Sequence, residues 1–260
     1  MVDEPTEPDE LVVLKLGGSV ITNKDSPETV DDLALNGVLD AVAAAYKQTN
    51  AAFRLILVHG GGSFGHVHAA EHGVSTTEGT ADAAAANAIH SAMKRLNGVV
   101  VDRLQERDVA ALPVHPLSVA ARDDTGTLSL PATATEGLLD QGFVPVLHGD
   151  VIAHAGEGVT VLSGDEIVTS LADSLGASRV GLCSTVPGVL DADDKVIGEI
   201  GSFSDVESVL GGSESTDVSG GMAAKVRELL DLGAPAQIFG PNAVAAFLQG
   251  ENPGTLIDGQ

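Results

Sequence analysis

Basic residues are scarce in this chain, and their scarcity excludes several classes of partner. Thirteen Lys and Arg stand against 37 Asp and Glu, which gives a formal net charge of −24, and the acids are spread along the chain. A surface with this much negative charge repels nucleic acid and anionic membranes. Neither is therefore expected as a partner. Evenly spread carboxylates suit molar salt, because the Debye length there falls to about 3 Å and the repulsion between like charges is screened. The composition therefore favours a halophilic origin.

Cysteine and long apolar runs are also scarce. The single cysteine, Cys183, cannot form an internal disulfide and is expected to be a buried core thiol. No apolar run approaches the roughly 18 residues of a membrane span. The opening MVDEPTEPDE carries acids and prolines where a secretory signal would need basic and then apolar residues. We expect a cytoplasmic protein with a disordered acidic tail over residues 1–10.

Apolar runs alternate with amphipathic stretches along the chain. Strands are predicted in LVVLKL, RLILV, ALPVHP, GFVPVLHG, SRVGLCS and AQIFG. Helices are predicted over residues 26–47, 80–107 and 132–141, from Ser163 onward and from about Ser219 onward, with hairpins over 151–163 and 190–200. Such alternation predicts an α/β fold with a mostly parallel sheet and ligands at the carboxyl ends of the strands. Near residue 150 the strand–helix alternation gives way to a predicted hairpin, which predicts a boundary between two lobes.

Three glycine loops lie between a predicted strand and a predicted helix. They are Gly17-Gly18-Ser19, Gly60-Gly61-Gly62 and Ser219-Gly220-Gly221. Free backbone N–H groups and a positive helix end favour an anion at such a junction, and missing Cβ atoms let a phosphate approach the backbone. Basic residues lie close to all three loops in the sequence: Lys15, Lys24, His66 and Lys225. This recurrence favours phosphate binding over three unrelated tight turns.

Neither standard nucleotide fingerprint is complete. The chain lacks GxxxxGK[ST], and GGGSFG fits the GxGxxG spacing within a run of glycines but is not followed by a convincing ribose-binding acid about 20 residues later. A P-loop ATPase and a Rossmann dehydrogenase are therefore disfavoured, whereas a kinase of another architecture remains open.

Four motifs in order resemble the amino acid kinase superfamily: KLGGS, HGGG, SGDE and SGGMAAK, within a similarity that spans Leu11 to Ile257. The resemblance implies a three-layer αβα sandwich with a mostly parallel central sheet. It implies an N-terminal lobe over 11–150 that binds the phosphoryl acceptor and a C-terminal lobe over 151–260 that binds ATP. It also suggests a homodimer.

Within that superfamily, GGGSFGH and a second lysine, Lys24, nine positions after Lys15, resemble the isopentenyl phosphate kinase branch. The implied reaction is ATP-dependent phosphorylation of isopentenyl phosphate to isopentenyl diphosphate. The acceptor in that branch is a monophosphate, and His66 is the residue implied to hold it.

The resemblance, with the chemistry of phosphoryl transfer, assigns roles to the scarce charges. Lys15 and Lys24 suit the transferring phosphoryl, Lys225 the β and γ phosphates, and Mg²⁺ the bridging oxygens. Asp165 would orient the lysines or hold the metal through water, and no residue is expected as a direct metal ligand. No general base is needed, because the attacking phosphate oxygen is already ionised.

The implied contacts fall into two groups. Nucleotide contacts are expected at Lys15, Gly17, Gly18, Ser19, Gly61, Thr185, Gly188, Gly221 and Lys225. Acceptor contacts are expected at Gly60, Gly61, Gly65, His66 and Gly164. One segment departs from the superfamily: STVPGVLDADD stands where a TDVDGVY-like pattern is common, which leaves the adenine contacts least supported.

Several alternatives remain open at this level. The acceptor could be another small phosphate or a fosfomycin-type phosphonate, and a binding or storage protein could share the fold without catalysis. Asp165 could simply complement its helix dipole. Ile89 and Met93 could pack a helix or line a pocket for an isoprenoid tail. His59 is expected to be structural, and the remaining histidines other than His66 are not expected to be ligands: His68 and His72 on a helix surface, and His90, His115, His148 and His154.

Overall fold

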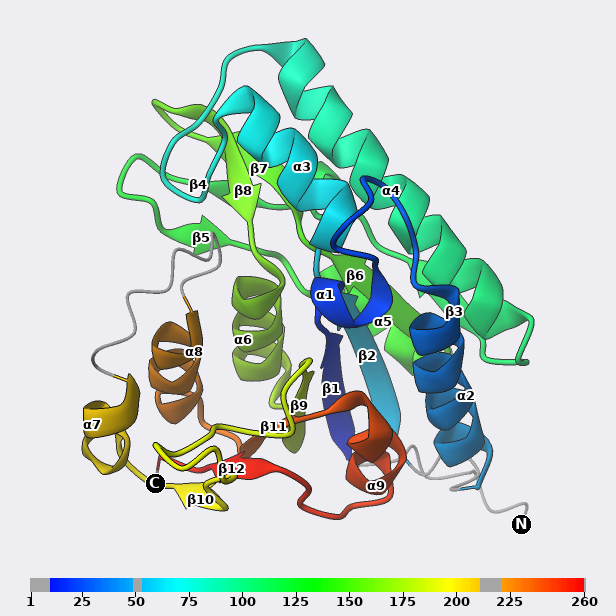
Figure 1. Cartoon of the computed structure of the whole chain (residues 1–260). Helices are drawn as coiled ribbons and strands as arrows, with labels where there is room; N and C mark the ends of the chain where they lie inside the picture. Colours follow the sequence, from blue (N-terminus) through cyan, green and yellow to red (C-terminus); the bar gives the residue numbers. More distant parts are fainter. Residues whose placement is uncertain (1–9, 49–52, 211–220, 260) are drawn as a thin grey trace.

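The computed structural model describes residues 10–48, 53–210 and 221–259, and a central sheet runs through them (Figure 1). Within these residues the sheet has eight strands. Their spatial order is β10 (Glu199–Ile200), β12 (Thr255–Ile257), β11 (Ala236–Phe239), β9 (Arg179–Cys183), β1 (Leu11–Leu16), β2 (Arg54–His59), β6 (Val144–His148) and β3 (Ala111–Pro113). Every neighbouring pair is parallel except β11 with β12, which confirms the mostly parallel sheet.

Helices cover both faces of this sheet (Figure 1). One face carries α2 (Asp32–Gln48), α4 (Ala83–Gln105) and α9 (Val244–Leu248), and the other carries α5 (Thr133–Asp140), α6 (Gly164–Leu175) and α8 (Gly221–Leu230). Side chains of a strand alternate between faces. Val12 and Leu14 of β1 accordingly join the first core, whereas Leu11 and Val13 join the second. The predicted three-layer αβα sandwich is confirmed.

A second, smaller sheet contains the predicted hairpin. β7 (Asp150–His154) and β8 (Gly158–Leu162) pair antiparallel, and β4 (Ala121–Arg122) and β5 (Leu128–Ser129) extend the sheet. Val151 of the hairpin packs on Ala69 of α3 (Gly62–His72) and on Ile89 of α4. The hairpin thus follows the predicted lobe boundary at residue 150 but packs against the part of the chain before it.

The helix predicted from residue 26 begins only at Asp32, so that prediction is wrong. A short helix, α1 (Gly18–Ile21), and a loop occupy the preceding segment. Glu28 there has a φ of 47°, in the left-handed region that a right-handed helix excludes. The Asp31 side chain instead accepts a hydrogen bond from the Ala34 N–H, as a helix cap does.

A second difference concerns the hairpin predicted over residues 190–200. Leu190 and Val196 form an isolated antiparallel bridge, and β10 then pairs parallel with β12 rather than with its own predecessor. The predicted tail, apart from residue 10, and two residues of the third glycine loop, Ser219 and Gly220, lie outside the described residues. In the described part of the chain, no helix has the length and apolar character needed to cross a membrane.

Candidate active site

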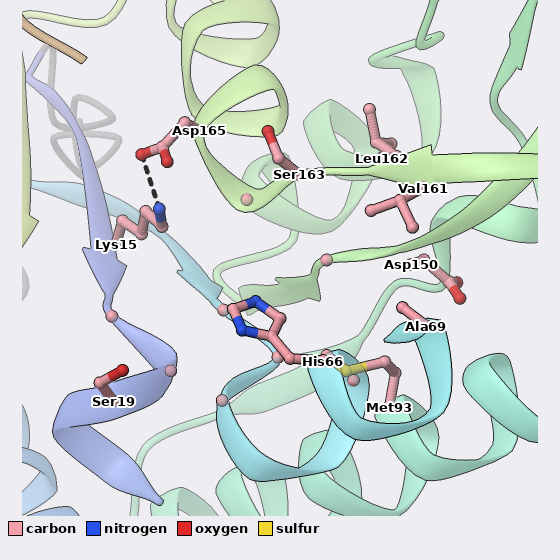
Figure 2. A pocket seen from close by; sticks show the side chains of 18 of the residues that line it. Lys15, Ser19, His66, Ala69, Met93, Asp150, Val161, Leu162, Ser163 and Asp165 are labelled. Carbon is pink, nitrogen blue, oxygen red and sulfur yellow. Dashed lines mark hydrogen bonds and ion pairs between the residues drawn. The ribbon is translucent and has the colours of Figure 1, made fainter. Parts of the chain in front are cut away.

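In the central sheet, β1 lies between β2, which follows it in the sequence, and β9, which comes much later. The carboxyl end of β1 is therefore a topological switch point. A cavity of about 220 Å³ opens there (Figure 2). Its lining includes thirteen of the predicted site residues: Lys15, Gly17, Gly18, Ser19, Lys24, Gly60, Gly61, Gly65, His66, Gly164, Asp165, Thr185 and Lys225. Residues far apart in the sequence therefore share one cavity.

Two predicted nucleotide contacts do not line this cavity. Gly188 packs on the C-terminal part of the chain, where an added Cβ would come within 2.7 Å of Thr255 Oγ1 and of a Val196 methyl. Gly221 is the first residue of α8 and has a φ of 66°. Packing and backbone geometry thus explain both glycines, and their contacts with nucleotide remain predictions.

Lys15, Asp165 and Lys225 form an ionic cluster in the cavity wall. Lys15 alternates with Leu14 and Leu16 along β1 and therefore faces α6, whose first turn carries Asp165. Lys15 Nζ donates to Asp165 Oδ1 at 2.6 Å (Figure 2). Lys225 Nζ lies 3.2 Å from Asp165 Oδ2. The two groups form an ion pair without the geometry of a hydrogen bond. Asp165 thus holds two ammonium groups toward the cavity.

Burial and charge shift the pKa values of this cluster in defined directions. Burial would raise the pKa of Asp165, but Lys15 and Lys225 outweigh it and leave that pKa below its ordinary value. Burial lowers the pKa of Lys15, with Asp165 opposing that effect and Lys225 reinforcing it. Lys15 therefore needs an anionic Asp165 to stay charged at this buried position.

The start of α6 directs further N–H groups at the same cavity. Ser163 caps the helix by accepting from the Glu166 N–H, and the Glu166 side chain accepts from the Ser163 N–H, which confirms the predicted cap. Gly164 follows, and a Cβ there would lie 3.1 Å from Lys15 Cε. The missing side chain therefore lets Lys15 lie against a helix end that favours an anion.

The first two glycine loops pack directly on each other. A Cβ on Gly18 would lie 2.1 Å from the Gly62 nitrogen, and one on Gly60 would lie 2.7 Å from the Gly18 nitrogen. Thr22 Oγ1 joins the loops, since it donates to the Gly18 carbonyl and accepts from the Ser63 N–H. These glycines are needed for the approach of the two loops, whatever ligand the loops hold.

Lys24 lies in an exposed loop that Glu28 fastens to two helices. Glu28 Oε1 accepts from His68 of α3 at 2.6 Å, and Oε2 accepts from Arg95 of α4. The Glu28 N–H donates to the Ser63 carbonyl. Hydrogen bonds from Arg95 and His68 lower the pKa of Glu28, so it stays anionic. This role of Glu28 could not be predicted from the sequence, because its left-handed backbone and its distant partners leave no local pattern.

The cavity has a polar centre and an apolar end. The His66 ring points into the middle of the cavity, and beyond it lie Ala69, Met93, Val161 and Leu162 (Figure 2). A Cβ on Gly65 would lie 2.8 Å from Met93 Sδ, so the glycine lets Met93 reach the cavity. Met93 is buried against the core and also lines the cavity, whereas its contact with an isoprenoid tail remains a prediction.

Behind the cavity lies a cluster of histidines that the sequence did not reveal. His115 Nδ1–H donates to His148 Nε2 at 2.8 Å, and His90 Nδ1–H donates to Asp150 at 2.8 Å. Asp150 lines the cavity, and its two oxygens accept from three N–H groups, those of the His90 ring, Leu117 and Val151. Burial lowers the pKa of His148 to about 4. Asp150 was missed because its partners come from distant segments.

Two buried groups match their predicted structural roles. His59 is fully buried; its Nδ1–H donates to the Gly60 carbonyl and its Nε2 accepts from Asn97. Burial, with a contribution from His148, lowers the pKa of His59 to about 3. Cys183 is buried as well, and burial raises the pKa of its thiol to about 12.

Comparison with known proteins places this geometry in a family. The amino acid kinase family pattern matches residues 10–238. The chain is 65% identical to the isopentenyl phosphate kinase of Haloferax volcanii over 250 residues, covering 96% of this chain and 99% of that protein. It is 33% identical to the isopentenyl phosphate kinase of Methanocaldococcus jannaschii, covering 95% of this chain and 98% of that protein. The Haloferax relative agrees with the halophilic origin predicted from composition.

Solved structures agree. An isopentenyl phosphate kinase structure superimposes with a TM-score of 0.78 and 28% identity, covering 95% of this chain and 98% of that one. A UMP kinase from Ureaplasma parvum, at 17% identity and a TM-score of 0.64, shares the fold over 95% of this chain and 99% of its own. The chain belongs to the amino acid kinase family, and within that family it groups with the isopentenyl phosphate kinases.

Proposed function

We propose that this protein transfers the γ-phosphoryl group of ATP to isopentenyl phosphate and forms isopentenyl diphosphate. One observation carries the proposal: three lysines, His66 and an apolar end share a single cavity. The charged part suits two phosphates, and the apolar end suits a short hydrocarbon tail. The relatives described above, at 65% and 33% identity over nearly the whole chain, are isopentenyl phosphate kinases.

The residues divide the work by position. His66 would donate to the acceptor phosphate, and Lys15 and Lys24 would neutralise the phosphoryl group in transfer. Lys225 and the N-terminus of α6 would hold the donor phosphates. Bond formation joins an acceptor oxygen to the γ phosphorus, and the bond to the β–γ bridging oxygen breaks to release ADP. Positioning and charge neutralisation are the main demands of such a reaction.

Mg²⁺ is proposed to reach this site on the phosphates of ATP. Among the described residues, Asp150 and Asp165 are the carboxylates that line the cavity, and N–H or ammonium groups already engage both. We therefore propose that neither carboxylate ligates the metal directly. Mg²⁺ commonly binds substrate phosphates and keeps several waters. When bound, it would supply further neutralisation of the phosphate charge.

The lobe assignment is also part of the proposal. We place the acceptor on the part formed by residues 11–150 together with the β7–β8 hairpin, because that hairpin closes the apolar end. ATP would lie toward residues 163–260. A homodimer in the cytoplasm remains our expectation, and light scattering at high KCl would measure the oligomeric state.

A panel of acceptors tests the function. Release of ADP would be measured in molar KCl with ATP and Mg²⁺ against isopentenyl phosphate, fosfomycin, other small monophosphates and no acceptor. The highest kcat/KM is expected with isopentenyl phosphate. Preferred turnover of another acceptor would overturn the assignment, and ATP binding without turnover of any acceptor would support the storage alternative.

A further inference from the structure

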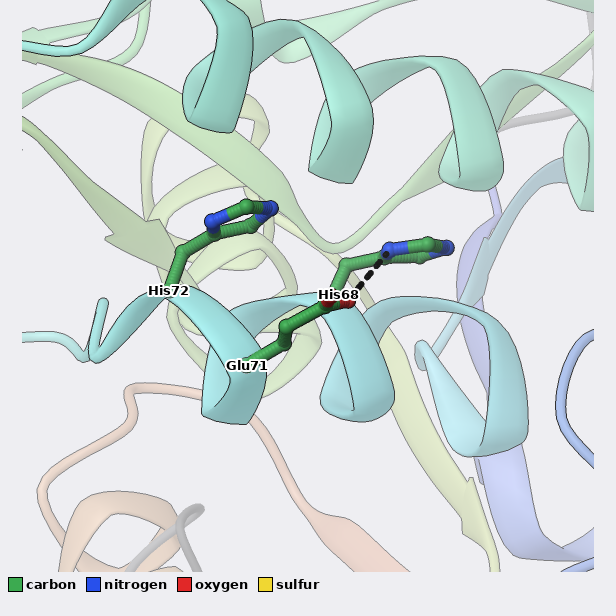
Figure 3. Close-up of side chains that lie close together, drawn as sticks. All are labelled: His68, Glu71 and His72. Carbon is green, nitrogen blue, oxygen red and sulfur yellow. Dashed lines mark ion pairs between the residues drawn. The ribbon is translucent and has the colours of Figure 1, made fainter.

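We propose that His68, Glu71 and His72 on α3 bind one transition-metal ion of the zinc class. The three residues stand at positions i, i+3 and i+4, so they lie on one face of the helix. One ligand atom from each lies within 4.8 Å of the others (Figure 3). Glu71 and His72 are exposed, so an ion can reach them directly from solvent.

Glu28 prepares His68 for this role. The Nε2–H of His68 donates to Glu28 Oε1 at 2.6 Å, which leaves the Nδ1 lone pair for a metal. That Nδ1 lies 3.7 Å from Glu71 Oε2 (Figure 3). Metal-bound histidines regularly donate their second N–H to a carboxylate, which fixes the tautomer and raises the basicity of the ligating nitrogen. Glu28 therefore supplies the outer carboxylate of such a site, held in turn by Arg95.

The donor atoms select the class of metal. Two imidazole nitrogens and one carboxylate oxygen suit Zn²⁺, with water completing a four-coordinate shell, and they also suit Ni²⁺ or Cu²⁺. Mg²⁺ prefers oxygen ligands and should not compete at this position.

This site is separate from the catalytic cavity. His68, Glu71 and His72 are absent from the cavity lining, whereas His66 belongs to it. At 3.6 residues per turn, His66 and His68 are roughly 200° apart around the helix. A bound metal would therefore stabilise the outer face of α3. The hydrogen bond between His68 and Glu28 would connect the metal site to the loop of Lys24.

Calorimetric titration of Zn²⁺ into the chelator-treated full chain tests the proposal, in molar KCl with millimolar Mg²⁺ to occupy weak carboxylate sites. One zinc per chain is expected. Because the imidazoles must be neutral to bind, affinity should fall as the pH is lowered. Loss of the outer carboxylate in Glu28→Gln should weaken binding about 10- to 100-fold, and His72→Gln should weaken it at least as much.

His154→Gln is the matched control, since it removes an imidazole that contacts Thr160 on the β7–β8 hairpin. It should bind zinc as the wild-type protein does. A second readout is thermal unfolding, because a metal bound to the folded chain raises its melting temperature. The proposal is overturned if the wild-type chain binds no stoichiometric zinc, or if His72→Gln binds it with unchanged affinity.

Discussion

Lys15 Nζ lies 2.6 Å from Asp165 Oδ1, and both side chains are about nine-tenths buried. The pair joins the central strand to the start of α6, where the other carboxylate oxygen meets Lys225. One anion thus balances two cations in the wall of an otherwise very acidic protein. Arriving phosphates would find these cations already oriented, which lowers the reorganisation needed for transfer.

Replacing the carboxylate should therefore disable the lysines. Asp165→Asn leaves Lys15 and Lys225 to repel each other, so Lys15 should lose charge or turn away. Misplacement of catalytic groups by about 1 Å can cost about 100-fold in rate, and a loss of kcat of that size is expected. Steady-state kinetics would measure it. Asp173→Asn on the exposed face of the same helix is the control, and equal losses in both variants would contradict this role.

His66→Ala should separate the two substrates. Loss of a charged hydrogen bond costs about 1.5–3 kcal/mol, which raises the KM for isopentenyl phosphate about 10- to 100-fold. The KM for ATP should stay nearly constant, since His66 is assigned to the acceptor. Initial rates over a grid of both substrates check this. A parallel rise in both KM values would rule out the assignment, and His154→Ala should change neither.

Glu28 and Lys24 should act as a unit. Glu28→Gln weakens the hydrogen bonds to His68 and Arg95, so the loop of Lys24 loosens and kcat should fall, while Lys24→Ala lowers kcat further. If Glu28 acts through Lys24, the double variant should be no slower than Lys24→Ala alone. Additive losses in this cycle would mean that Glu28 works by another route. Asp25→Asn in the same loop is the control.

Gly18→Ala should destabilise the protein and abolish activity. Its Cβ would lie 2.1 Å from the Gly62 backbone, so the two loops would have to separate. Overpacking of this kind typically costs about 1–3 kcal/mol in unfolding free energy. Gly98→Ala in α4 meets open space and should instead stabilise by roughly 1 kcal/mol. Urea unfolding compares the two variants, and a Gly18→Ala variant as stable and active as wild type would refute the packing argument.

Acid should destabilise the fold through its buried histidines. The pKa values of His59 and His148, about 3 and about 4, lie below the unfolded value of 6.5, so the unfolded chain binds more protons. Their contribution to the free energy of unfolding is complete above pH 6.5 and is lost as the pH falls from 6.5 through their folded pKa values. Over that pH range, each histidine lowers the free energy of unfolding by up to about 1.4 kcal/mol per pH unit.

Urea unfolding in molar KCl from pH 7.5 to 5 would measure this effect, and the slope should be smaller in His59→Gln. An unfolding free energy that stays flat over this range would contradict the burial of neutral imidazoles.

Local patterns were enough to predict six strands of the central sheet, the first two glycine loops and the cap at Ser163. Continuous apolar runs mark strands buried on both faces, and a capping box leaves its own spacing in the sequence. The order of the glycine loops also placed Lys15, His66 and Lys225 at one end of the sheet, since parallel strands share their carboxyl ends.

Contacts between distant segments could not be predicted in this way. Asp150 meets His90 across 60 residues, and Glu28 meets Arg95 across 67. The late start of α2 has the same origin, because the left-handed Glu28 is stabilised by side chains from α3 and α4. Packing of the loops, which explains Gly18 and Gly62, is equally invisible in the sequence.

The central claim is that two phosphates are drawn together in one cavity, and a crystal structure with isopentenyl phosphate and a non-hydrolysable ATP analogue tests it most directly. The account predicts the acceptor phosphate on His66, its tail toward Met93, and the γ phosphate between Lys15 and Lys24. An acceptor bound with its phosphate outside this cavity, or turned so that its tail meets the lysines, would contradict it.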